Sequence, residues 1–514
     1  MKRLLPMILV FGALTLTACK PEAAATERPP TPQQVEQLPP PLTPRSTLFE
    51  SDLDDLSLFA SGLIESERAA LEGLEDCSTY RIDVALSQDL LHVDGQQEVD
   101  YTNREDVPLE EIYFRLYPNI SGGAASVSDV LVVGTPVDPV YEKERSALRL
   151  PLPTPLQPGD EIHIKMRFSV KLPTEMSGNY GLFGSFDGVV AMQELYPVIP
   201  VYDDEGWNIE IPPSFGDLTY LDASFYLVRV TVPEHLTLIA SGIEVETSIQ
   251  NDLQVSTFAA GPARDFYLVA VEDYEVTSTS LGETTIYSYA PAEKIPFANT
   301  GLEIAAEALS GYSSRFGAYP YTELEIVATP MQALGMEYPN IVAISIDLYD
   351  ADLEIAGLPA GILLESSLAH EVAHQWFYGA VGNDQVDEPW VDEALTQYAT
   401  WTYYLDRYGK GSADGFRDSL VGRWERVGKA DIPIGLPTGE YEPVEYGAIV
   451  YGRGPLFLEA LAQEMGQKTF DAFMRAYFQN NKWGIGTAAN FRQLAEESCG
   501  CDLSELFDAW VYPP

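Results

Sequence analysis

The stretch Leu368–Phe377 reads LAHEVAHQWF and holds two of the five histidines in the 514-residue sequence. Residues four apart on a helix share a face, so His370 and His374 can direct their imidazoles at one point. Zinc accepts neutral imidazole nitrogen, but two such ligands leave it short of its usual tetrahedral set. The spacing therefore predicts a metal site on a helix, completed by a third ligand from elsewhere in the chain.

Glu393, in the stretch WVDEALTQYATW, supplies a third ligand nineteen positions after His374, on what the pattern predicts to be the next helix. Two histidines and one carboxylate leave a fourth position for water, as in catalytic zinc sites. Glu371 is rotated by about 100° from His370 around the helix. From there it can take a proton from that water and pass it to a leaving amine. The alternative is a core helix whose histidines bind no metal, but a chance HExxH is rare in so histidine-poor a chain.

The length and composition set the class of protein. A chain of 514 residues exceeds the size at which one hydrophobic core keeps growing, so at least two domains are expected. Hydrophobic residues at 46% and charged residues at 21% are typical of a folded globular protein. The 78 acidic and 30 basic side chains give a formal charge of -48, which argues against a nucleic-acid partner. The acidic surface is either simply solvated or attracts cationic peptides.

The N-terminal nineteen residues, MKRLLPMILVFGALTLTAC, have the proportions of a signal peptide. Two early cations precede an apolar run, Leu4–Leu16, that is too short to cross a bilayer comfortably. The end of the stretch, Leu16-Thr17-Ala18-Cys19, resembles the lipobox of bacterial lipoproteins, in which the cysteine is acylated. We expect a lipid anchor at Cys19 and a location outside the cytoplasmic membrane, at the cell surface or in the periplasm. A soluble secreted protein cut nearby is the alternative.

The rest of the chain divides by the period of its apolar residues. Residues 20–50 form a Pro-rich segment, predicted to be a disordered linker. Residues 51–275 are predicted to form an antiparallel β domain with a short helical lead-in, because apolar and polar residues alternate in several segments. These segments are Tyr80–Leu86, Glu111–Tyr117, Ile162–Val170 and Phe225–Val232. Residues 276–514 change mainly to helical spacing and are predicted to form a second domain. The expected fold class is α+β.

Helical spacing first appears at Ala298–Phe316 in this second domain. A buried strand is predicted at Leu324–Ala328, a loop and strand at Gly335–Val342, and helices from Leu363 onward.

The remaining cysteines and histidines give weaker signals. Three cysteines besides Cys19 allow one disulfide, whose pairing the sequence does not decide. They are Cys77, Cys499 and Cys501. The other histidines lack ligand-like neighbours at a useful spacing and are predicted to lie at the surface. They are His92, His163 and His235.

The motif HEVAHQW, followed by WVDEA and preceded by GMEYPN at residues 335–340, resembles the gluzincin aminopeptidases. This zinc family includes aminopeptidase N and leukotriene hydrolase, and the similarity runs from about Asp76 to the C-terminus. The resemblance implies a saddle-shaped β domain packed against a thermolysin-like catalytic domain with one Zn²⁺ per chain. It makes His370, His374 and Glu393 the zinc ligands and Glu371 the general base.

The resemblance also implies how substrate is bound. Gly335, Met336 and Glu337 match the family's exopeptidase strand, in which the backbone pairs with the peptide and the glutamate binds the free α-amine. Glu194, in QELYP, falls where related chains place a residue that assists amine binding. Gln193 is the alternative for that position.

Tyr451, in YGRG, resembles the tyrosine of the family's YxKG motif, with Arg453 in place of the usual lysine. Its phenol would donate a hydrogen bond to the developing oxyanion. Tyr446 is the rival for this role. Asp392 and Ala394 also replace the more usual Asn and Gly beside the third ligand.

The sequence ends at Pro514, without the long C-terminal helical domain of many relatives, so a more open cleft is expected. We predict a zinc-dependent aminopeptidase, tethered to a membrane, that acts on extracellular peptides. A thermolysin-like endopeptidase and a peptide-binding envelope lipoprotein without activity are the alternatives.

Overall fold

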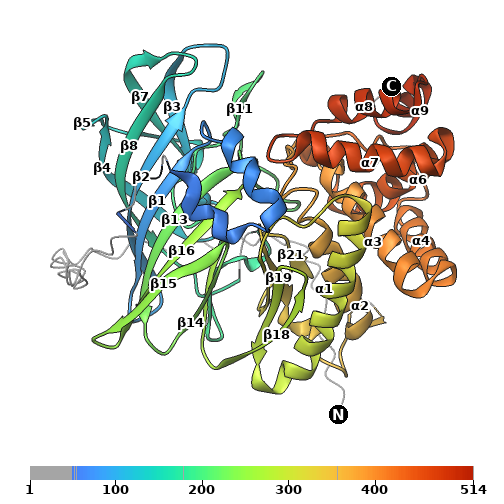
Figure 1. Ribbon diagram of the computed structural model, residues 1–514, viewed down its shortest axis with the longest axis horizontal. Coiled ribbons are helices and arrows are strands. Elements are labelled where there is room, and N and C mark those ends of the chain that lie inside the picture. The colour runs from blue at the N-terminus through green and yellow to red at the C-terminus, as the bar shows by residue number, and fades with distance from the viewer. Residues whose placement is uncertain (1–48, 51–52, 54, 177–178, 356, 513–514) are drawn as a thin grey trace, which may run out of the picture. The chain divides into compact units, whose positions relative to one another are not determined.

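The computed structural model describes residues 49–50, 53, 55–176, 179–355 and 357–512 (Figure 1). The predicted signal peptide, Cys19 and nearly all of the predicted linker lie outside these residues. Among the helices that are described, none combines the length and the apolar character needed to span a bilayer. The segment expected to be a helical lead-in folds as two 3₁₀ helices, η1 (Leu56–Gly62) and η2 (Glu65–Gly73).

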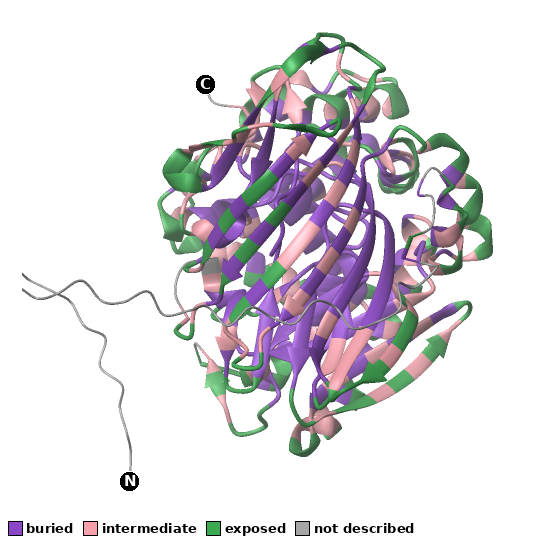
Figure 2. Cartoon of the chain, turned by 90° about the vertical axis from the view of Figure 1, so that its left-hand side faces the viewer, coloured by how far each residue is buried: buried purple, intermediate pink, exposed green. Residues whose placement is uncertain are grey.

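The N-terminal domain is built on an eight-stranded sheet with the order β15-β16-β13-β1-β2-β8-β4-β5. In β8 the side chains alternate between buried and more exposed, and Figure 2 shows the same alternation across the sheet. The alternation in Ile162–Val170 thus predicted a half-buried strand correctly. The strands are β1 (Thr79–Leu86), β2 (His92–Thr102), β4 (Ala124–Val132), β5 (Thr135–Pro136), β8 (Glu161–Lys171), β13 (Ser224–Pro233), β15 (Ile243–Gln250) and β16 (Leu253–Ala263).

The pairs in this sheet are antiparallel except one, because β1 and β13 run parallel with Thr79 opposite Phe225. Alternation reports which face of a strand is buried but not the direction of its neighbour. Smaller sheets complete the domain. They contain β14 (Thr237–Ala240), β17 (Leu268–Val271), β10 (Val189–Met192) and β9 (Phe183–Phe186); β3 (Leu109–Arg115), β7 (Ala147–Leu156) and β6 (Val140–Glu142); and β11 (Tyr202–Asp203) and β12 (Gly206–Trp207).

A five-stranded mixed sheet with the order β18-β19-β20-β22-β21 opens the second domain. Helix α1 (Ile295–Arg315) packs on β18 and β19, and α2 (Ala360–Ala373) packs on β22 and β21 (Figure 1). The short strand β21 lies at the edge of the sheet, so one of its sides is free of strand partners within the described structure. The strands are β18 (Tyr274–Leu281), β19 (Thr284–Pro291), β20 (Glu323–Thr329), β21 (Gly335–Met336) and β22 (Ile341–Ser345), followed by the hairpin β23 (Glu354–Ile355) and β24 (Leu358–Pro359).

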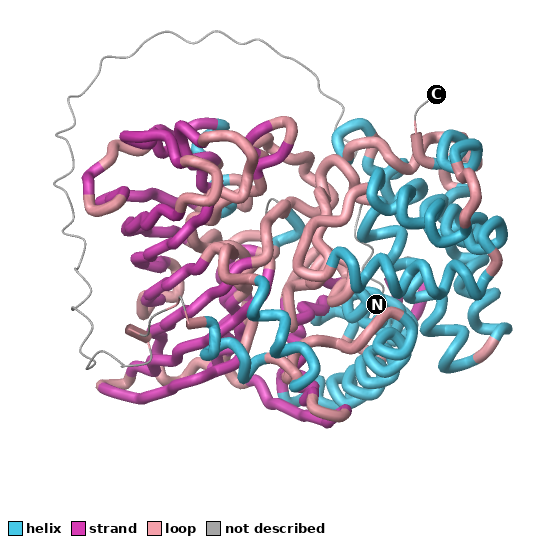
Figure 3. The backbone as a smooth tube through the Cα atoms, turned by 45° about the horizontal axis from the view of Figure 1, so that its top comes forward, coloured by secondary structure: helices cyan, strands magenta, loops and turns pink. Residues whose placement is uncertain are grey.

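Helices follow α2 to the end of the described chain, and Figure 3 shows them gathered away from the large β sheet. They are α3 (Trp390–Tyr408), α4 (Lys410–Glu425), α5 (Pro443–Ala448), the π-helical turn η9 (Ile449–Arg453), α6 (Gly454–Met465), α7 (Gln467–Asn481), α8 (Ala488–Cys499) and α9 (Ser504–Trp510). Cys499 at the end of α8 pairs with Cys501, and Cys77 is a buried free thiol. This is the pairing that the sequence left open.

Arg264, directly after β16, connects the β domain to the helical domain. Its side chain is buried, and its guanidinium donates hydrogen bonds to the carbonyls of Leu221 at 3.2 Å, Tyr378 at 2.8 Å and Ala380 at 3.1 Å. A further hydrogen bond reaches the carbonyl of Gly484. One cation thus satisfies backbone acceptors from both domains, close to the chain that follows the HEVAH helix.

Candidate active site

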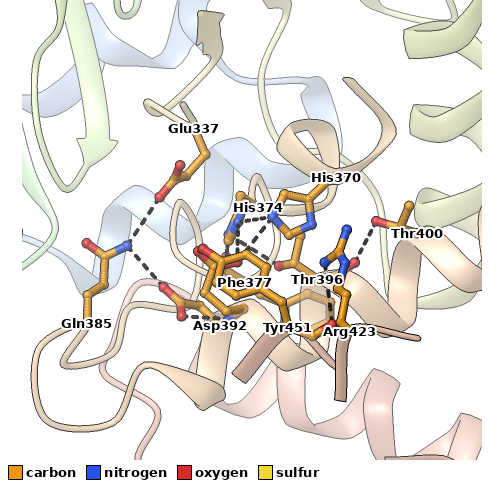
Figure 4. Close-up of polar contacts among 11 residues, drawn as sticks. Glu337, His370, His374, Phe377, Gln385, Asp392, Thr396, Thr400, Arg423 and Tyr451 are labelled. Atoms are coloured by element: carbon orange, nitrogen blue, oxygen red, sulfur yellow. Dashed lines mark hydrogen bonds and ion pairs between the residues drawn. The ribbon is translucent and has the colours of Figure 1, made fainter. Parts of the chain in front are cut away.

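The two motif histidines lie at the C-terminal end of α2. His370 is in the last turn, and His374 caps the helix with its N–H 3.3 Å from the carbonyl of His370. Their Nε2 atoms are 3.2 Å apart (Figure 4). Glu393, in the first turn of α3, places Oε2 3.1 Å from Nε2 of His370 and 3.6 Å from Nε2 of His374. The structure therefore brings the three predicted ligands to one point.

The chemistry of this donor set fits zinc. The three ligand atoms lie within 4.8 Å of one another, and Oε2 of Glu393 is buried with no hydrogen-bond partner among the described residues. Burial lowers the pKa of His370 to about 4, which keeps its imidazole neutral, as a metal ligand must be. Burial also opposes the ionisation of Glu393, but the two imidazoles outweigh it and hold the pKa of its carboxyl well below the usual range. Although burial opposes its charged form, Glu337 and Glu393 raise the pKa of His374 well above the usual value, so metal binding there would displace a proton. Two imidazole nitrogens and one carboxylate oxygen thus face the same space.

Two contacts at Nδ1, on the side of the ring away from the other ligands, fix the orientation of His374. Its Nδ1 lies 2.9 Å from the carbonyl of Phe377 and 3.2 Å from Oγ1 of Thr396. A proton on Nδ1 that is donated to the carbonyl leaves the lone pair on Nε2, directed at the site. The sequence did not identify these partners, because any residue can offer a backbone carbonyl and Thr396 lies 22 positions away on α3.

Glu371 lies beneath the edge strand. It is buried on α2, and a Cβ atom placed on Gly335 of β21 would lie 2.5 Å from both its Cγ and its Oε1. One carboxylate oxygen of Glu371 falls within a second cluster with Glu337 and His374, whose ligand atoms lie within 4.8 Å of one another. Burial and the neighbouring Glu337 raise the pKa of Glu371 well above its usual value. A carboxylate with a raised pKa beside a metal site suits proton transfer.

The side-chain amide of Gln385 orients Glu337, and no sequence motif points to this glutamine. Nε2 of Gln385 donates to Oε1 of Glu337 at 3.2 Å and to Oδ2 of Asp392 at 3.0 Å. The Oγ1 of Thr219, from the β domain, donates to Oε1 of Gln385 at 2.7 Å and so fixes which end of the amide faces the acids. Figure 4 shows Gln385 between the two carboxylates.

Glu194 lines a small pocket together with Glu337, on the β-domain side of the site. Its side chain is 1% exposed, and its Oε2 has no hydrogen-bond partner within the described structure. Gln193 lines the same pocket, but its Oε1 accepts a hydrogen bond from the Tyr338 hydroxyl at 3.1 Å. Burial, with the nearby Asp265, raises the pKa of Glu194 well above its usual value. A buried acid without a cationic partner among the residues of its pocket is suited to a cationic ligand.

Tyr451 is the tyrosine that contacts the metal group, by which we mean the three predicted ligands His370, His374 and Glu393. It lies in the π-helical turn η9, a type of turn that is frequent at functional sites. Its hydroxyl donates to Oε1 of Glu393, and its ring is 6.0 Å from that of His370. The rival Tyr446 has a buried hydroxyl with no partner among the described residues and does not line the cleft. The structure thus places Tyr451, and not Tyr446, at the predicted ligands.

Arg453 and Ala394, two departures from the family pattern, have packing roles. Nη1 of Arg453 donates to the carbonyls of Ile432 at 2.7 Å and Trp510 at 2.8 Å, which ties η9 to the end of α9. A Cβ atom on Gly454 would lie 2.7 Å from Cβ of Ala394, so α3 and α6 approach closely at this point. Asp392, a third departure, accepts the backbone N–H of Glu393 at 2.7 Å.

These groups open onto one cleft of about 320 Å³. Its lining includes Gly335, Met336, Glu337, His370, Glu371, His374, Glu393 and Tyr451, and also Tyr180, Asp217, Gln397 and Arg423, which the sequence did not indicate. Glu194 lies in the adjoining pocket that shares Met336 and Glu337. The other histidines are far more exposed, with side-chain exposures of 49% for His92, 44% for His163 and 61% for His235.

Comparison with known proteins shows which proteins this chain is similar to. Residues 300–510 match the peptidase family M1 domain. Aminopeptidase 2 of Candida albicans is 23% identical over 378 residues, covering 69% of this chain and 39% of that protein. Aminopeptidase M1 of Arabidopsis thaliana is 22% identical over 310 residues, covering 56% and 34%. The chain thus spans less than half the length of these curated relatives.

Solved structures share the fold over both domains. The M1 zinc metallopeptidase of Deinococcus radiodurans, as a mutant bound to a Tyr-Ser-Ala substrate, is 19% identical with a TM-score of 0.63. That match covers 85% of this chain and 95% of the other. A two-domain M1 zinc metallopeptidase mutant bound to L-tryptophan is 20% identical with the same TM-score and coverage. Residues 300–510 of this chain thus match the peptidase family M1 domain, and its two domains share the fold of solved M1 zinc metallopeptidases.

Proposed function

We propose that this protein is a zinc-dependent aminopeptidase that removes N-terminal residues from peptides. The observation that carries the proposal is the joining of two features in one cleft: a group of two histidines and a carboxylate, and an adjacent pocket of buried acids. The relatives named as aminopeptidases and the similar structures with bound peptide or amino acid support it. We further propose that one zinc ion is held per chain, by His370, His374 and Glu393.

The acidic pocket would select the substrate N-terminus. Glu337 and Glu194 line it with carboxylates that lack a cationic side-chain partner among the pocket residues. The α-ammonium of a peptide offers three donors and a positive charge, which match these acceptors. The free side of β21 offers backbone groups to an extended peptide, as in strand addition. A peptide held in this way has its first peptide bond beside His370 and His374.

The residues around that bond have the roles needed for hydrolysis. When bound, zinc supplies Lewis acidity, which makes water more acidic and polarises a carbonyl. Glu371 accepts the proton of the attacking water and returns it to the leaving amine. The Tyr451 hydroxyl exchanges its hydrogen bond to Glu393 for one to the developing oxyanion. The burial of Glu371 strengthens its interactions with the charges that develop.

We also propose that Cys19, which lies outside the described residues, carries a lipid anchor and that the enzyme acts on extracytoplasmic peptides. The basis is the lipobox-like Leu16-Thr17-Ala18-Cys19 after a signal-peptide pattern. Metabolic labelling with a clickable fatty acid should tag the wild-type protein and not Cys19→Ala, and fractionation should move the variant out of the membrane fraction. Equal labelling of the two would refute the anchor.

The activity itself is tested with the purified, zinc-loaded protein. Aminoacyl chromogenic anilides should be hydrolysed, chelation should abolish the activity, and added Zn²⁺ should restore it. Glu371→Gln should lower kcat by about 10³-fold or more without loss of zinc. An N-acetylated peptide should resist cleavage, because its amine carries no charge for Glu337. Internal cleavage of the acetylated peptide would favour the endopeptidase, and zinc-loaded protein inactive on every substrate would favour peptide binding alone.

A further inference from the structure

Arg423, on α4, is a cation in a cleft lined by carboxylates. We infer that its guanidinium binds a carboxylate of the substrate beyond the scissile bond, so that the enzyme prefers short peptides with a free C-terminus. This inference rests on the proposed aminopeptidase function and deepens it. It concerns the leaving-group side of the cleft, which neither the metal group nor the amine pocket occupies.

Arg423 differs in the sign of its charge from the carboxylates that line the cleft. Four carboxylate residues line the cleft: Asp217, Glu337, Glu371 and Glu393. Arg423 is the one lysine or arginine among the described residues that line it. Because the other charged side chains are acids or metal-site imidazoles, Arg423 is the one side chain of the described cleft lining, outside the proposed zinc site, that favours an anionic part of a substrate.

The guanidinium of Arg423 also makes few hydrogen bonds within the described structure. Nη1 donates a long hydrogen bond, 3.4 Å, to the carbonyl of Tyr451, while Nε and Nη2 have no hydrogen-bond partner in the described structure. No ion pair to Arg423 is found there either. Arg417, nearly two turns earlier on the same helix, makes three hydrogen bonds to the carboxylate of Glu459 at 2.7 to 3.0 Å. In a protein with 78 acids and 30 basic residues, a half-buried arginine without an acidic partner is available to a ligand.

The position of Arg423 matches the direction of a bound peptide. In Figure 4, Glu337 and Arg423 lie on opposite sides of the two histidines. Tyr451 links the metal group to Arg423, since its hydroxyl contacts Glu393 and its carbonyl accepts from Arg423. A tyrosine is about as long as one to two extended residues, each of which spans roughly 3.3–3.6 Å. A peptide with its amine at Glu337 would therefore bring a group one or two residues beyond the scissile bond toward Arg423.

The chemistry of the ligand follows from the guanidinium. Its planar donors match a carboxylate and can engage both oxygens. A peptide offers this group from two sources: the C-terminus of a dipeptide or tripeptide, or an acidic side chain just after the scissile bond. A dipeptide or tripeptide places its C-terminal carboxylate one or two residues beyond the scissile bond, near Arg423, whatever its side chains are.

Binding to a hydrolysis-deficient protein tests the inference without relying on activity. Zinc-loaded Glu371→Gln is titrated by calorimetry with a neutral tripeptide and with its C-terminal amide. The amide should bind about 10-fold more weakly, which corresponds to about 1.4 kcal/mol for a charge-assisted contact. Adding Arg423→Gln should reduce this ratio to near 1. Adding Arg426→Gln instead removes an exposed arginine three positions later, outside the cleft lining, and should leave the ratio at about 10.

An amidated tripeptide with glutamate after the scissile bond separates the two sources. If this peptide binds as weakly as the neutral amide, the C-terminal carboxylate is the ligand of Arg423. If it binds as tightly as the tripeptide with a free C-terminus, the glutamate side chain is a ligand. Either result supports the inference if Arg423→Gln abolishes the difference in affinity. Equal binding of acid and amide, or discrimination that survives Arg423→Gln, would overturn the inference. Anilide hydrolysis by protein with Glu371 intact reports separately on the proposed function, since an anilide has no carboxylate.

Discussion

Gly335 and Glu371 are in such close contact that no side chain fits between them: a Cβ atom on Gly335 would lie 2.5 Å from both Cγ and Oε1 of the glutamate. The edge strand can therefore pass over the predicted base only as glycine. This explains the glycine of the GMEYPN stretch by sterics, without reference to its backbone angles.

Gly335→Ala should displace Glu371 and lower kcat by about 10- to 100-fold, because an error of about 1 Å in a catalytic group costs that much. The zinc content should stay at the wild-type level, since Gly335 does not belong to the ligand group. The two measurements are anilide kinetics and metal analysis of the same sample. Gly415→Ala, in α4 with no atom within 4 Å of the added methyl, is the matched control. Unchanged kcat in Gly335→Ala would mean that the glutamate moves without consequence.

Glu393→Gln should weaken zinc binding by at least about 100-fold, because loss of a supporting partner alone costs 10- to 100-fold. The substitution removes the negative charge that lies 3.1 Å and 3.6 Å from the two imidazole nitrogens. Zinc affinity is measured by competition with a chromogenic chelator. His163→Ala should bind zinc like the wild type, because His163 is a half-exposed partner of Asp100 in the β domain. Equal affinity in Glu393→Gln would exclude Glu393 as a ligand.

Tyr451→Phe should lower kcat by about 100- to 1000-fold with a smaller effect on KM, as expected for a donor to an oxyanion. Tyr446→Phe removes a hydroxyl that has no partner in the described structure and should remain within about twofold of the wild type. Steady-state kinetics on one anilide measures both variants. A larger loss in Tyr446→Phe than in Tyr451→Phe would reverse the assignment that the geometry favours.

The sequence predicted those parts of the site that local geometry controls. The four-residue spacing of His370 and His374 fixes their common face on any helix, and the strand period in Ile162–Val170 fixes the buried face of β8. The chemistry required a third ligand, since a metal with two imidazoles needs another, and the next predicted helix offered Glu393. The residue spacing within a short segment was enough to predict which side chains share a face of the helix or the strand.

The remaining parts depend on contacts between distant segments. Thr219 and Gln385 are 166 residues apart, and no local pattern marks either one. Arg423 enters the cleft because α4 packs against η9, a tertiary contact. Spacing alone does not decide between Tyr446 and Tyr451, because Tyr451 lies in the π-helical turn η9, which shifts the direction of side chains relative to a regular helix. The sequence could therefore predict that His370, His374 and Glu393 come together, but not the network that orients them.

The pH dependence of stability should show the effect of Glu325, on β20. Burial, with a contribution from Glu323, raises the pKa of Glu325 from 4.5 to about 8, against a hydrogen bond from Tyr289 that lowers it. The folded state therefore holds this proton more tightly than the unfolded state. The resulting stability is fully present below pH 4.5 and is lost as the pH rises through about 8.

Urea unfolding between pH 5 and 9 checks this expectation. The wild-type free energy of unfolding should fall with rising pH, and Glu325→Gln should remove part of that fall, on the order of a few kcal/mol at the alkaline end. Glu303→Gln, an exposed position on α1, should follow the wild-type curve. Parallel curves for wild type and Glu325→Gln would show that the buried carboxyl ionises freely in the folded protein.

Arg264→Met should destabilise the protein by about 3 kcal/mol, because it leaves buried backbone carbonyls without a donor. The contacts extend from Leu221 in the β domain to Tyr378 and Ala380 after the HEVAH helix, so one side chain supports the interface that carries the site. The chain is built closely around it: a Cβ atom on Gly382 would lie 2.3 Å from its Cζ. Urea unfolding measures the loss, and Arg167→Met, at an arginine 69% exposed beside Asp129, should change stability by less than about 0.5 kcal/mol. A similarly small change in Arg264→Met would mean that water replaces the guanidinium at this interface.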